Sequence, residues 1–274
     1  MSAEPIPIET FPDDTSVALR AAELVVEHAR AAVAARGMFT LAVSGGHTPG
    51  QMLAELARRK DFPWDQTAIY QVDERIAPNG DPNRNLTLLW DSLPEAAFSQ
   101  LHPMPVQDED LEGAATRYAS ALPERFDLIH LGIGADGHTA SLVPGDPVLE
   151  VEDRDVALTG IYMGLPRMTV TYPVLNRARH LLWLITGKEK QDALSRLLRG
   201  DKSIPAGRVT SSQAQIIADA QAADAQPPAK RAAAGRPLRA GSRSAPIAST
   251  PNRIPPSKAK ALRDARQASS GRCL

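Results

Sequence analysis

The residues best suited to proton chemistry in this sequence are Asp136 and His138, which stand two positions apart. Histidine titrates near neutral pH and is the side chain most often used as a general base. A neighbouring carboxylate can hold the imidazole in one tautomer. Glycines at positions 132, 134 and 137 surround the pair, and glycine lets a ligand approach the backbone closely. The alternative is a histidine that only hydrogen-bonds the loop backbone, but the carboxylate and the glycines favour a catalytic pair.

A second polar segment, SGGHTP at 44–49, follows a short apolar run and is expected to open a helix with Thr48 as its N-cap. Free backbone N–H groups and the helix dipole attract anions to such a terminus. The segment matches neither the Walker A spacing nor GxGxxG, and an ordinary strand-to-helix turn is the alternative. We assign Ser44, Gly45, Gly46 and Thr48 to a candidate phosphate site.

Charged residues also stand where strands are expected to end. Asp73 and Arg75 follow the predicted strand 68–72, where a carboxylate can orient a substrate hydroxyl or a water and an arginine can bind an anion. Arg167 precedes one strand and Lys188 follows another through a glycine, so both can reach a phosphate at the sheet edge. The alternatives are an exposed ion pair in a solvated loop at 73–75 and surface cations at the other two positions.

Two other histidines are interpreted differently. His130 lies inside an apolar run, so we expect it to be a hydrogen-bonded core residue. His47 lies on the candidate anion loop, at a position where nothing demands an imidazole, and its role stays open.

Apolar runs and amphipathic segments alternate along the first 221 residues. Strands that alternate with helices predict an α/β fold with a mostly parallel sheet and helices on both faces. Such sheets bind ligands at the carboxyl ends of their strands, where the polar segments above fall. Strands are expected at 5–10, 39–43, 68–72, 101–106, 128–133, 155–160, 168–172, 180–186 and 215–218. Helices are expected at 13–36 with Asp14 or Thr15 as the cap, at 49–59, 85–93 and 111–122, directly after His138 with Thr139 or Ser141 as the cap, and at 173–178 and 189–198.

The charges divide the 274-residue chain into an acidic body and a basic end. Residues 222–274 hold 11 Lys or Arg against 2 Asp or Glu, which leaves 20 against 30 for residues 1–221. The end is rich in Ala, Pro, Arg and Ser and lacks apolar periodicity, so we expect an α/β domain over 1–221 and a disordered tail over 222–274. No aromatic residues are interleaved for base stacking in the tail, so we expect no nucleic-acid partner.

The lone cysteine, Cys273, excludes an intrachain disulfide and a cysteine-based metal site. The acidic amino-terminal segment lacks the long apolar stretch of a secretory signal, and no run approaches the ~18 apolar residues of a membrane span. We therefore expect a cytoplasmic protein without a membrane partner.

Taken together, the polar motifs resemble those of the 6-phosphogluconolactonases in the glucosamine-6-phosphate isomerase/6-phosphogluconolactonase family. They occur in order along the chain, and IPAGRV at 204–209 extends the resemblance toward residue 221. The motifs are SGGHTP (44–49), VDERIAPNGDPNRN (72–85), LGIGADGHTASLVPG (131–145), PRMT (166–169) and LITGKEK (184–190).

The resemblance implies a modified doubly wound α/β domain in a monomeric enzyme without a metal or organic cofactor. It implies hydrolysis of 6-phospho-D-glucono-1,5-lactone to 6-phospho-D-gluconate in the oxidative pentose phosphate pathway. His138 would be the general base, and Asp136 or Asp73 would orient it or the substrate hydroxyls. Arg75 or loop N–H groups would stabilise the oxyanion. The 6-phosphate would bind Ser44, Gly45, Gly46, Arg167 and Lys188.

Two alternatives stay open at this point. A glucosamine-6-phosphate deaminase shares both glycine loops, but its pattern has Asp-Glu-Tyr where this chain has DER at 73–75, and Ile-Ala-Phe-Asn-Glu where it has TASLV at 139–143. The missing glutamate matters because ring opening and amine loss use a longer proton relay. The other alternative is a non-catalytic sugar-phosphate sensor with the basic tail as its partner-binding arm. The intact Asp136–His138 pair argues against it, because a sensor needs no base.

Overall fold

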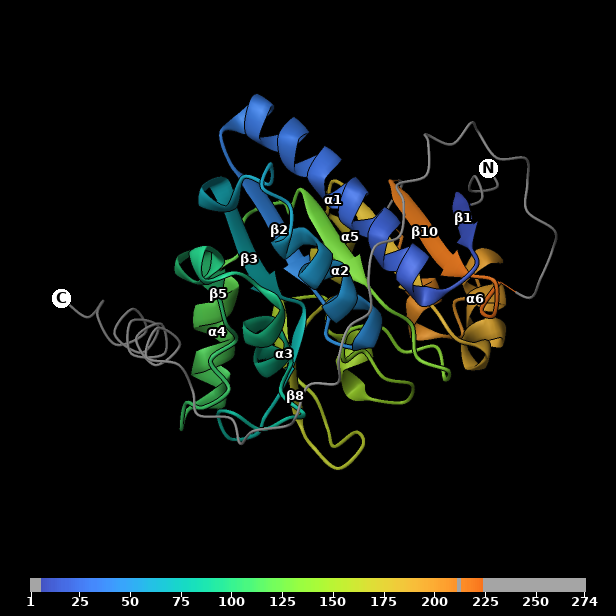
Figure 1. Ribbon diagram of the computed structural model, residues 1–274. Coiled ribbons are helices and arrows are strands. Elements are labelled where there is room, and N and C mark those ends of the chain that lie inside the picture. The colour runs from blue at the N-terminus through green and yellow to red at the C-terminus, as the bar shows by residue number, and fades with distance from the viewer. Residues whose placement is uncertain (1–5, 211–212, 224–274) are drawn as a thin grey trace, which may run out of the picture.

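The central strands of this protein are apolar on both faces, as expected for a parallel sheet that helices cover on each side. The computed structural model describes residues 6–210 and 213–223, and Figure 1 shows the sheet running through the middle of the molecule. All strand pairs in this sheet are parallel. Its strands lie in the order β1 (Ile8–Phe11), β10 (Ala214–Asp219), β9 (Leu181–Ile185), β6 (Leu128–Leu131), β2 (Phe39–Val43), β3 (Thr67–Gln71) and β5 (Leu101–His102).

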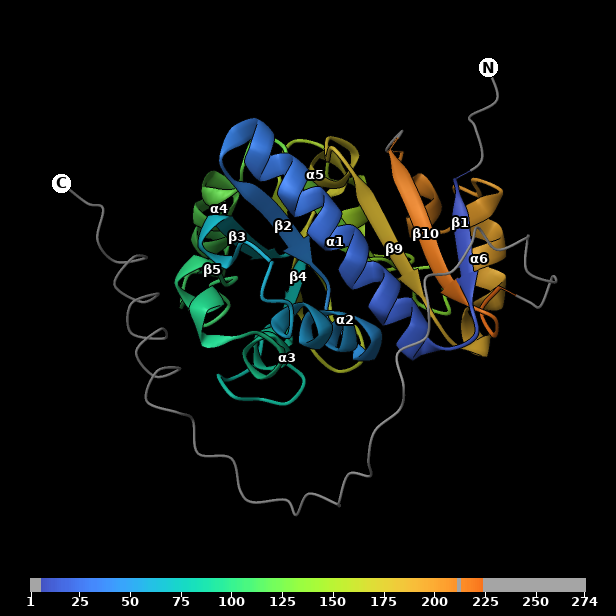
Figure 2. The same ribbon diagram turned by 45° about the horizontal axis from the view of Figure 1, so that its top comes forward.

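Helices pack on both faces of the sheet. Within the described residues they are α1 (Asp14–Arg36), α2 (His47–Ala57), α3 (Asn85–Ser92), α4 (Leu111–Ala121), α5 (Tyr172–Asn176) and α6 (Gln191–Leu198). Buried side chains of α1, α2 and α3 form one apolar cluster with the sheet, and those of α4, α5 and α6 form the other. Figure 2 shows α1 lying across the strands on its side of the sheet. The predicted α/β class, with a mostly parallel sheet between two helical layers, is confirmed.

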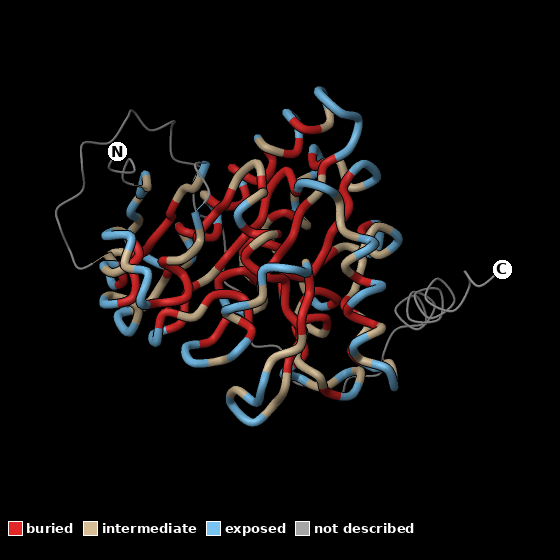
Figure 3. The backbone as a smooth tube through the Cα atoms, turned by 180° about the vertical axis from the view of Figure 1, so that it is seen from behind, coloured by how far each residue is buried: buried red, intermediate tan, exposed pale blue. Residues whose placement is uncertain are grey.

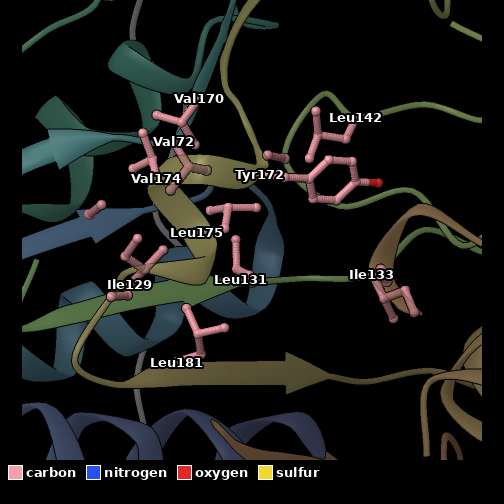
Figure 4. Close-up of a cluster of buried hydrophobic side chains, with 14 of the residues drawn as sticks. Val72, Ile129, Leu131, Ile133, Leu142, Val170, Tyr172, Val174, Leu175 and Leu181 are labelled. Carbon is pink, nitrogen blue, oxygen red and sulfur yellow. The ribbon is translucent and has the colours of Figure 1, made fainter. Parts of the chain in front are cut away.

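The side chains of β9 show how one strand serves both clusters. Leu182 and Leu184 belong to the cluster with α1, whereas Leu181, Trp183 and Ile185 belong to the cluster with α5 and α6. This alternation follows from the two-residue repeat of a strand. Figure 4 shows part of the second cluster, where α5 packs against β6 and β9. Figure 3 shows that the buried residues gather in the middle of the molecule.

A second, smaller sheet stands beside the parallel one. It consists of β4 (Asp73–Arg75), β8 (Arg167–Val170) and β7 (Val156–Leu158), and both of its strand pairs are antiparallel. The strands expected at 155–160 and 168–172 therefore exist, but they do not join the parallel sheet, and β4 was not expected at all. The connection between β7 and β8 holds no helix and is too short for a parallel crossover, so the two strands pair as a hairpin.

Most predicted elements are confirmed to within a few residues, and β1 is an edge strand as its prolines indicate. Helix α1 is capped by Asp13, whose carboxylate accepts the Ser16 N–H at 2.8 Å, rather than by Asp14 or Thr15. Thr48 is not an N-cap, because α2 begins at His47, two residues earlier than predicted, with Gly46 as its N-cap.

The helix expected directly after His138 is also wrong. Thr139 and Leu142 instead form an isolated antiparallel bridge, with Ala140 at a φ of 48° between them, so neither Thr139 nor Ser141 caps a helix. The left-handed conformation at Ala140 ends any helical path there.

Some predictions fall largely outside the described part of the chain. Residues 224–274 of the predicted tail, which include Cys273, lie outside the described residues. Among the described residues, no helix is long and apolar enough to cross a membrane. No group of three or more His, Cys, Asp or Glu residues with metal-ligand geometry occurs among them either.

Candidate active site

A cavity of about 310 Å³ lies at the carboxyl ends of β2, β6 and β9. The loops after these strands form most of its wall, and β4 and β8 of the small sheet complete it. This is the edge at which open α/β sheets bind ligands. The lining residues are 44–49, Asp73, Arg75, Asn85, 132–134, His138, Ala140, Arg167, 184–186, Glu189 and Lys190.

The loop after β6 brings Asp136 and His138 into direct contact, as the sequence predicts. Asp136 Oδ1 lies 2.6 Å from His138 Nδ1 and also accepts the His138 backbone N–H at 3.1 Å. Because Nδ1 is engaged, Nε2 is the ring nitrogen free to meet a ligand. A Cβ at Gly134 would lie 2.0 Å from His138 Nδ1, so only glycine leaves room for the pair.

Tyr162 is a third member of this group that the sequence analysis missed. Its hydroxyl donates to Asp136 Oδ2 at 3.1 Å and lies 3.3 Å from His138 Nδ1. Burial alone would raise the pKa of Asp136, but hydrogen bonds from His138 and Tyr162 outweigh it and hold that pKa below its ordinary value. Asp136 is therefore ionised at neutral pH.

Asp73 sits in a different network on the same cavity. Its carboxylate is buried and accepts the Ser141 hydroxyl at 2.6 Å and the Asn85 side-chain amide at 3.0 Å. Ser141 also lies 3.4 Å from Arg167 Nη1. Asp136 is therefore the carboxylate that touches His138, whereas Asp73 lines the cavity in a separate network.

Arg75 and Arg167 bring positive charge to the wall formed by the small sheet. Each guanidinium has a buried Nε without a hydrogen-bond partner, and the two residues lie opposite each other in β4 and β8. Burial lowers the pKa of Arg167, and the nearby positive charge of Arg75 lowers it further. This half of the cavity is suited to an anion.

The sequence of segment 73–75 taken alone suggests an exposed ion pair. The structure shows instead that its carboxylates are buried, with Asp73 4% and Glu74 0% exposed. Glu74 Oε2 lies 2.9 Å from Arg84 Nε, and the Glu74 carboxylate also accepts the backbone N–H groups of Arg75, Asn85 and Leu86. Glu74 therefore ties β4 to the start of α3. The sequence analysis assigned no role to Glu74, Arg84 or Asn85.

The segment that follows β2 forms the opposite wall. The Ser44 hydroxyl donates to His130 O at 3.1 Å and its N–H donates to His130 Nδ1 at 3.3 Å. His130 is fully buried, and burial lowers its pKa to about 3, so the predicted core role is confirmed. The Thr48 hydroxyl pairs with that of Thr186 at 2.7 Å. A Cβ at Gly45 would lie 1.8 Å from Asn85 Oδ1, so the two walls meet closely there.

One predicted cation lies outside the cavity lining. Lys188 is exposed and does not line the cavity, whereas Lys190, two residues later, is half-buried and does. A 3₁₀ turn over Lys188–Lys190 follows Gly187 and carries the second lysine, not the first, to the wall. No local sequence signal distinguishes the two lysines.

Known proteins resemble this chain over most of its described residues. The model of a family described as glucosamine-6-phosphate isomerases/6-phosphogluconolactonase matches residues 12–218. A 6-phosphogluconolactonase of Synechocystis is 38% identical over 191 residues, which are 65% of this chain and 79% of the relative. One from Mycobacterium tuberculosis is 34% identical over 227 residues, which are 75% of this chain and 92% of the relative.

Solved structures share the fold. The crystal structure of 6-phosphogluconolactonase from Thermotoga maritima is similar with a TM-score of 0.70 and 26% identity, over 78% of this chain and 99% of that chain. The family match covers every lining residue of the cavity. This chain belongs to the glucosamine-6-phosphate isomerase/6-phosphogluconolactonase family.

Proposed function

We propose that this protein hydrolyses 6-phospho-D-glucono-1,5-lactone to 6-phospho-D-gluconate, a step of the oxidative pentose phosphate pathway. The observation that carries the proposal is the hydrogen-bonded Asp136–His138 pair beside a cavity that also holds Arg75, Arg167 and Lys190. A base next to a cluster of cations suits the hydrolysis of an anionic ester. The names of the relatives at 38% and 34% identity support the same substrate.

The 6-phosphate group binds where cations and free N–H groups meet. We assign it to Ser44, Gly45, Gly46 and Thr48 at the start of α2, with Lys190 in place of Lys188 and with Arg167. Helix amino termini favour negative charge, and a lysine adds a point charge to the same anion. Binding this remote group positions the lactone ring for reaction.

His138 Nε2 takes a proton from a water molecule while the water oxygen bonds to the lactone carbonyl carbon. The carbonyl oxygen becomes negative, and Arg75 or the loop N–H groups stabilise it. The bond from that carbon to the ring oxygen then breaks, and His138 returns its proton to the ring oxygen. Asp136 remains ionised and stabilises the imidazolium, and general acid–base help of this kind contributes roughly 10²–10⁴-fold.

The test is hydrolysis of freshly prepared 6-phosphogluconolactone, coupled to 6-phosphogluconate dehydrogenase and corrected for spontaneous opening. We expect a clear enzyme-dependent rate. His138→Ala should lower kcat roughly 10²–10⁴-fold because it removes the base, while the affinity for 6-phosphogluconate, measured by calorimetry, stays close to that of the wild type. Equal loss of turnover and affinity would contradict the base assignment.

Other outcomes separate the alternatives. A wild-type protein that leaves the lactone unchanged but releases ammonia from glucosamine 6-phosphate would be a deaminase. No activity in either assay, together with retained binding of the sugar phosphate, would indicate a non-catalytic sensor. The cytoplasmic location, the monomeric state and the absence of a cofactor stay predictions.

A further inference from the structure

Tyr162 contacts both charged parts of the site, although no family motif quoted above contains it. Its hydroxyl donates to Asp136 Oδ2 at 3.1 Å and lies 3.3 Å from His138 Nδ1. Its ring lies under the Arg167 guanidinium, whose central carbon is 4.9 Å from the ring centre. Arg167 Nη2 also donates to the Tyr162 carbonyl oxygen at 3.3 Å. One residue therefore joins the acid–base pair to the cationic wall.

The turn that carries Tyr162 directs this side chain alone toward the site. Its neighbours Ile161 and Met163 are 76% and 81% exposed, whereas Tyr162 is half-buried. Met163 has a φ of 50°, a conformation that a non-glycine residue adopts at a cost, and Tyr162 forms an isolated bridge with Leu165. The turn is thus constrained rather than extended, which fixes the position of the Tyr162 ring.

Asp136 needs a second contact to keep its orientation. Its side chain is 39% exposed, and His138 bonds only Oδ1. The torsion of a carboxylate about its last bond is soft, so one partner on one oxygen leaves the group free to rotate. The Tyr162 hydroxyl occupies the other oxygen and removes that freedom.

We propose that Tyr162 is a positioning residue that holds Asp136 so that the His138 ring presents Nε2 to the substrate. The inference deepens the proposed lactone hydrolysis and rests on it. Among the described residues, the Asp136 carboxylate has two hydrogen-bonding partners, which are His138, through its ring and its backbone N–H, and the hydroxyl of Tyr162. The nearby cation Arg167 faces the ring of Tyr162. Loss of the Tyr162 hydroxyl removes a donor that lowers the pKa of Asp136, so that pKa rises.

The test compares Tyr162→Phe, which removes only the hydroxyl, with Met163→Ala, which alters an exposed neighbour on the same turn. Tyr162→Phe should lower kcat roughly 3- to 10-fold with KM within about 2-fold of the wild type, the size expected for the net contribution of one hydrogen bond. The pKa of Asp136, measured by carbon-13 NMR, should be higher in Tyr162→Phe than in the wild type. Met163→Ala should leave kcat, KM and the pKa of Asp136 unchanged.

Each outcome has one meaning. A wild type without lactonase activity would contradict the proposed function but not this inference. The positioning role would then be tested by carbon-13 NMR, which measures the pKa of Asp136 in the wild type and in Tyr162→Phe. An Asp136 pKa that does not change in Tyr162→Phe would overturn the positioning role. A Tyr162→Phe variant with the same kcat as an active wild type would overturn it as well. Equal losses in Tyr162→Phe and Met163→Ala would also overturn it, because they would show a general effect of the turn.

Discussion

Two lysines in one short turn show how closely a binding role depends on a single residue position. Lys188 and Lys190 share a sequence motif and a 3₁₀ turn, but only Lys190 lines the cavity. Their chemistry is identical, so any difference between them in substrate binding must come from where the turn places them. They form a matched pair for testing the proposed phosphate site.

Lys190→Ala should raise KM for the lactone roughly 10- to 100-fold, because it removes a charged contact with the phosphate. Lys188→Ala should leave KM within about 2-fold of the wild type, since an exposed lysine contributes little. The measurement is steady-state kinetics of both variants in the coupled assay, with thermal melting as the check on folding. A larger effect at Lys188 would return the phosphate role to the residue that the motif alone suggested.

At the scale of the elements, one buried ion pair contributes to the connection between the short strand β4 and the start of α3. Glu74 and Arg84 are 0% and 2% exposed, and Glu74 accepts backbone N–H groups at the start of α3 as well as that of Arg75. Removing one partner of a buried pair leaves the other charge without compensation. Asp73, Arg75 and the start of α3 should therefore shift together when Glu74 is changed.

Glu74→Gln should reduce the free energy of unfolding by about 3–5 kcal/mol, because it keeps the shape but leaves Arg84 as an uncompensated buried charge. Glu23→Gln is the control: its ion pair with Arg20 spans 3.3 Å, but Glu23 is 51% exposed, and the change should stay within about 0.5 kcal/mol. Urea unfolding of both variants measures the difference. Equal, small effects would show that the buried pair contributes no more than an exposed one.

The sequence predicts strands and polar pairs well where the pattern that encodes them is local. Alternating apolar runs place the parallel strands, and the two-residue spacing of Asp136 and His138 places the acid–base pair. The small sheet is missed because its pairing joins β4 to β8 across the chain, and no periodicity encodes that. Ser141 contacts Asp73 across 68 positions, and Tyr162 contacts Asp136 across 26. Such contacts exist only once the fold brings the loops together.

At the scale of the whole molecule, residues 222 and 223 pack against the α/β domain, although the predicted tail begins at 222. Ala222 is 1% exposed and packs with the cluster on the α5 side of the sheet, and its N–H donates to Asp219 Oδ1 at 2.7 Å. Asp219 also accepts the Gly187 N–H at 3.1 Å, just before the turn that carries Lys190. Residues 222 and 223 therefore belong with the α/β domain.

A protein truncated after residue 223 should keep the melting temperature within about 2 °C and the kcat/KM of the full chain, if the rest of the tail is passive. Truncation after residue 221 should lower both, because it removes the buried Ala222 and loosens Asp219. Calorimetry and the coupled assay on the two truncations measure this. Loss of activity in the longer one would assign the basic tail a part in catalysis.

The register of the small sheet has a thermodynamic consequence. Arg75 and Arg167 are paired directly across β4 and β8, and like charges opposite each other in a sheet are destabilising. An anion that contacts both guanidiniums offsets that repulsion. Part of its binding free energy therefore comes from removing an unfavourable interaction that is present in the folded protein without the anion. Ligand affinity and resistance to unfolding are then linked through the same two side chains. Neutralising either arginine would weaken anion binding, and it would remove this repulsion together with the hydrogen bond that the guanidinium donates to Asn83 O or to Tyr162 O.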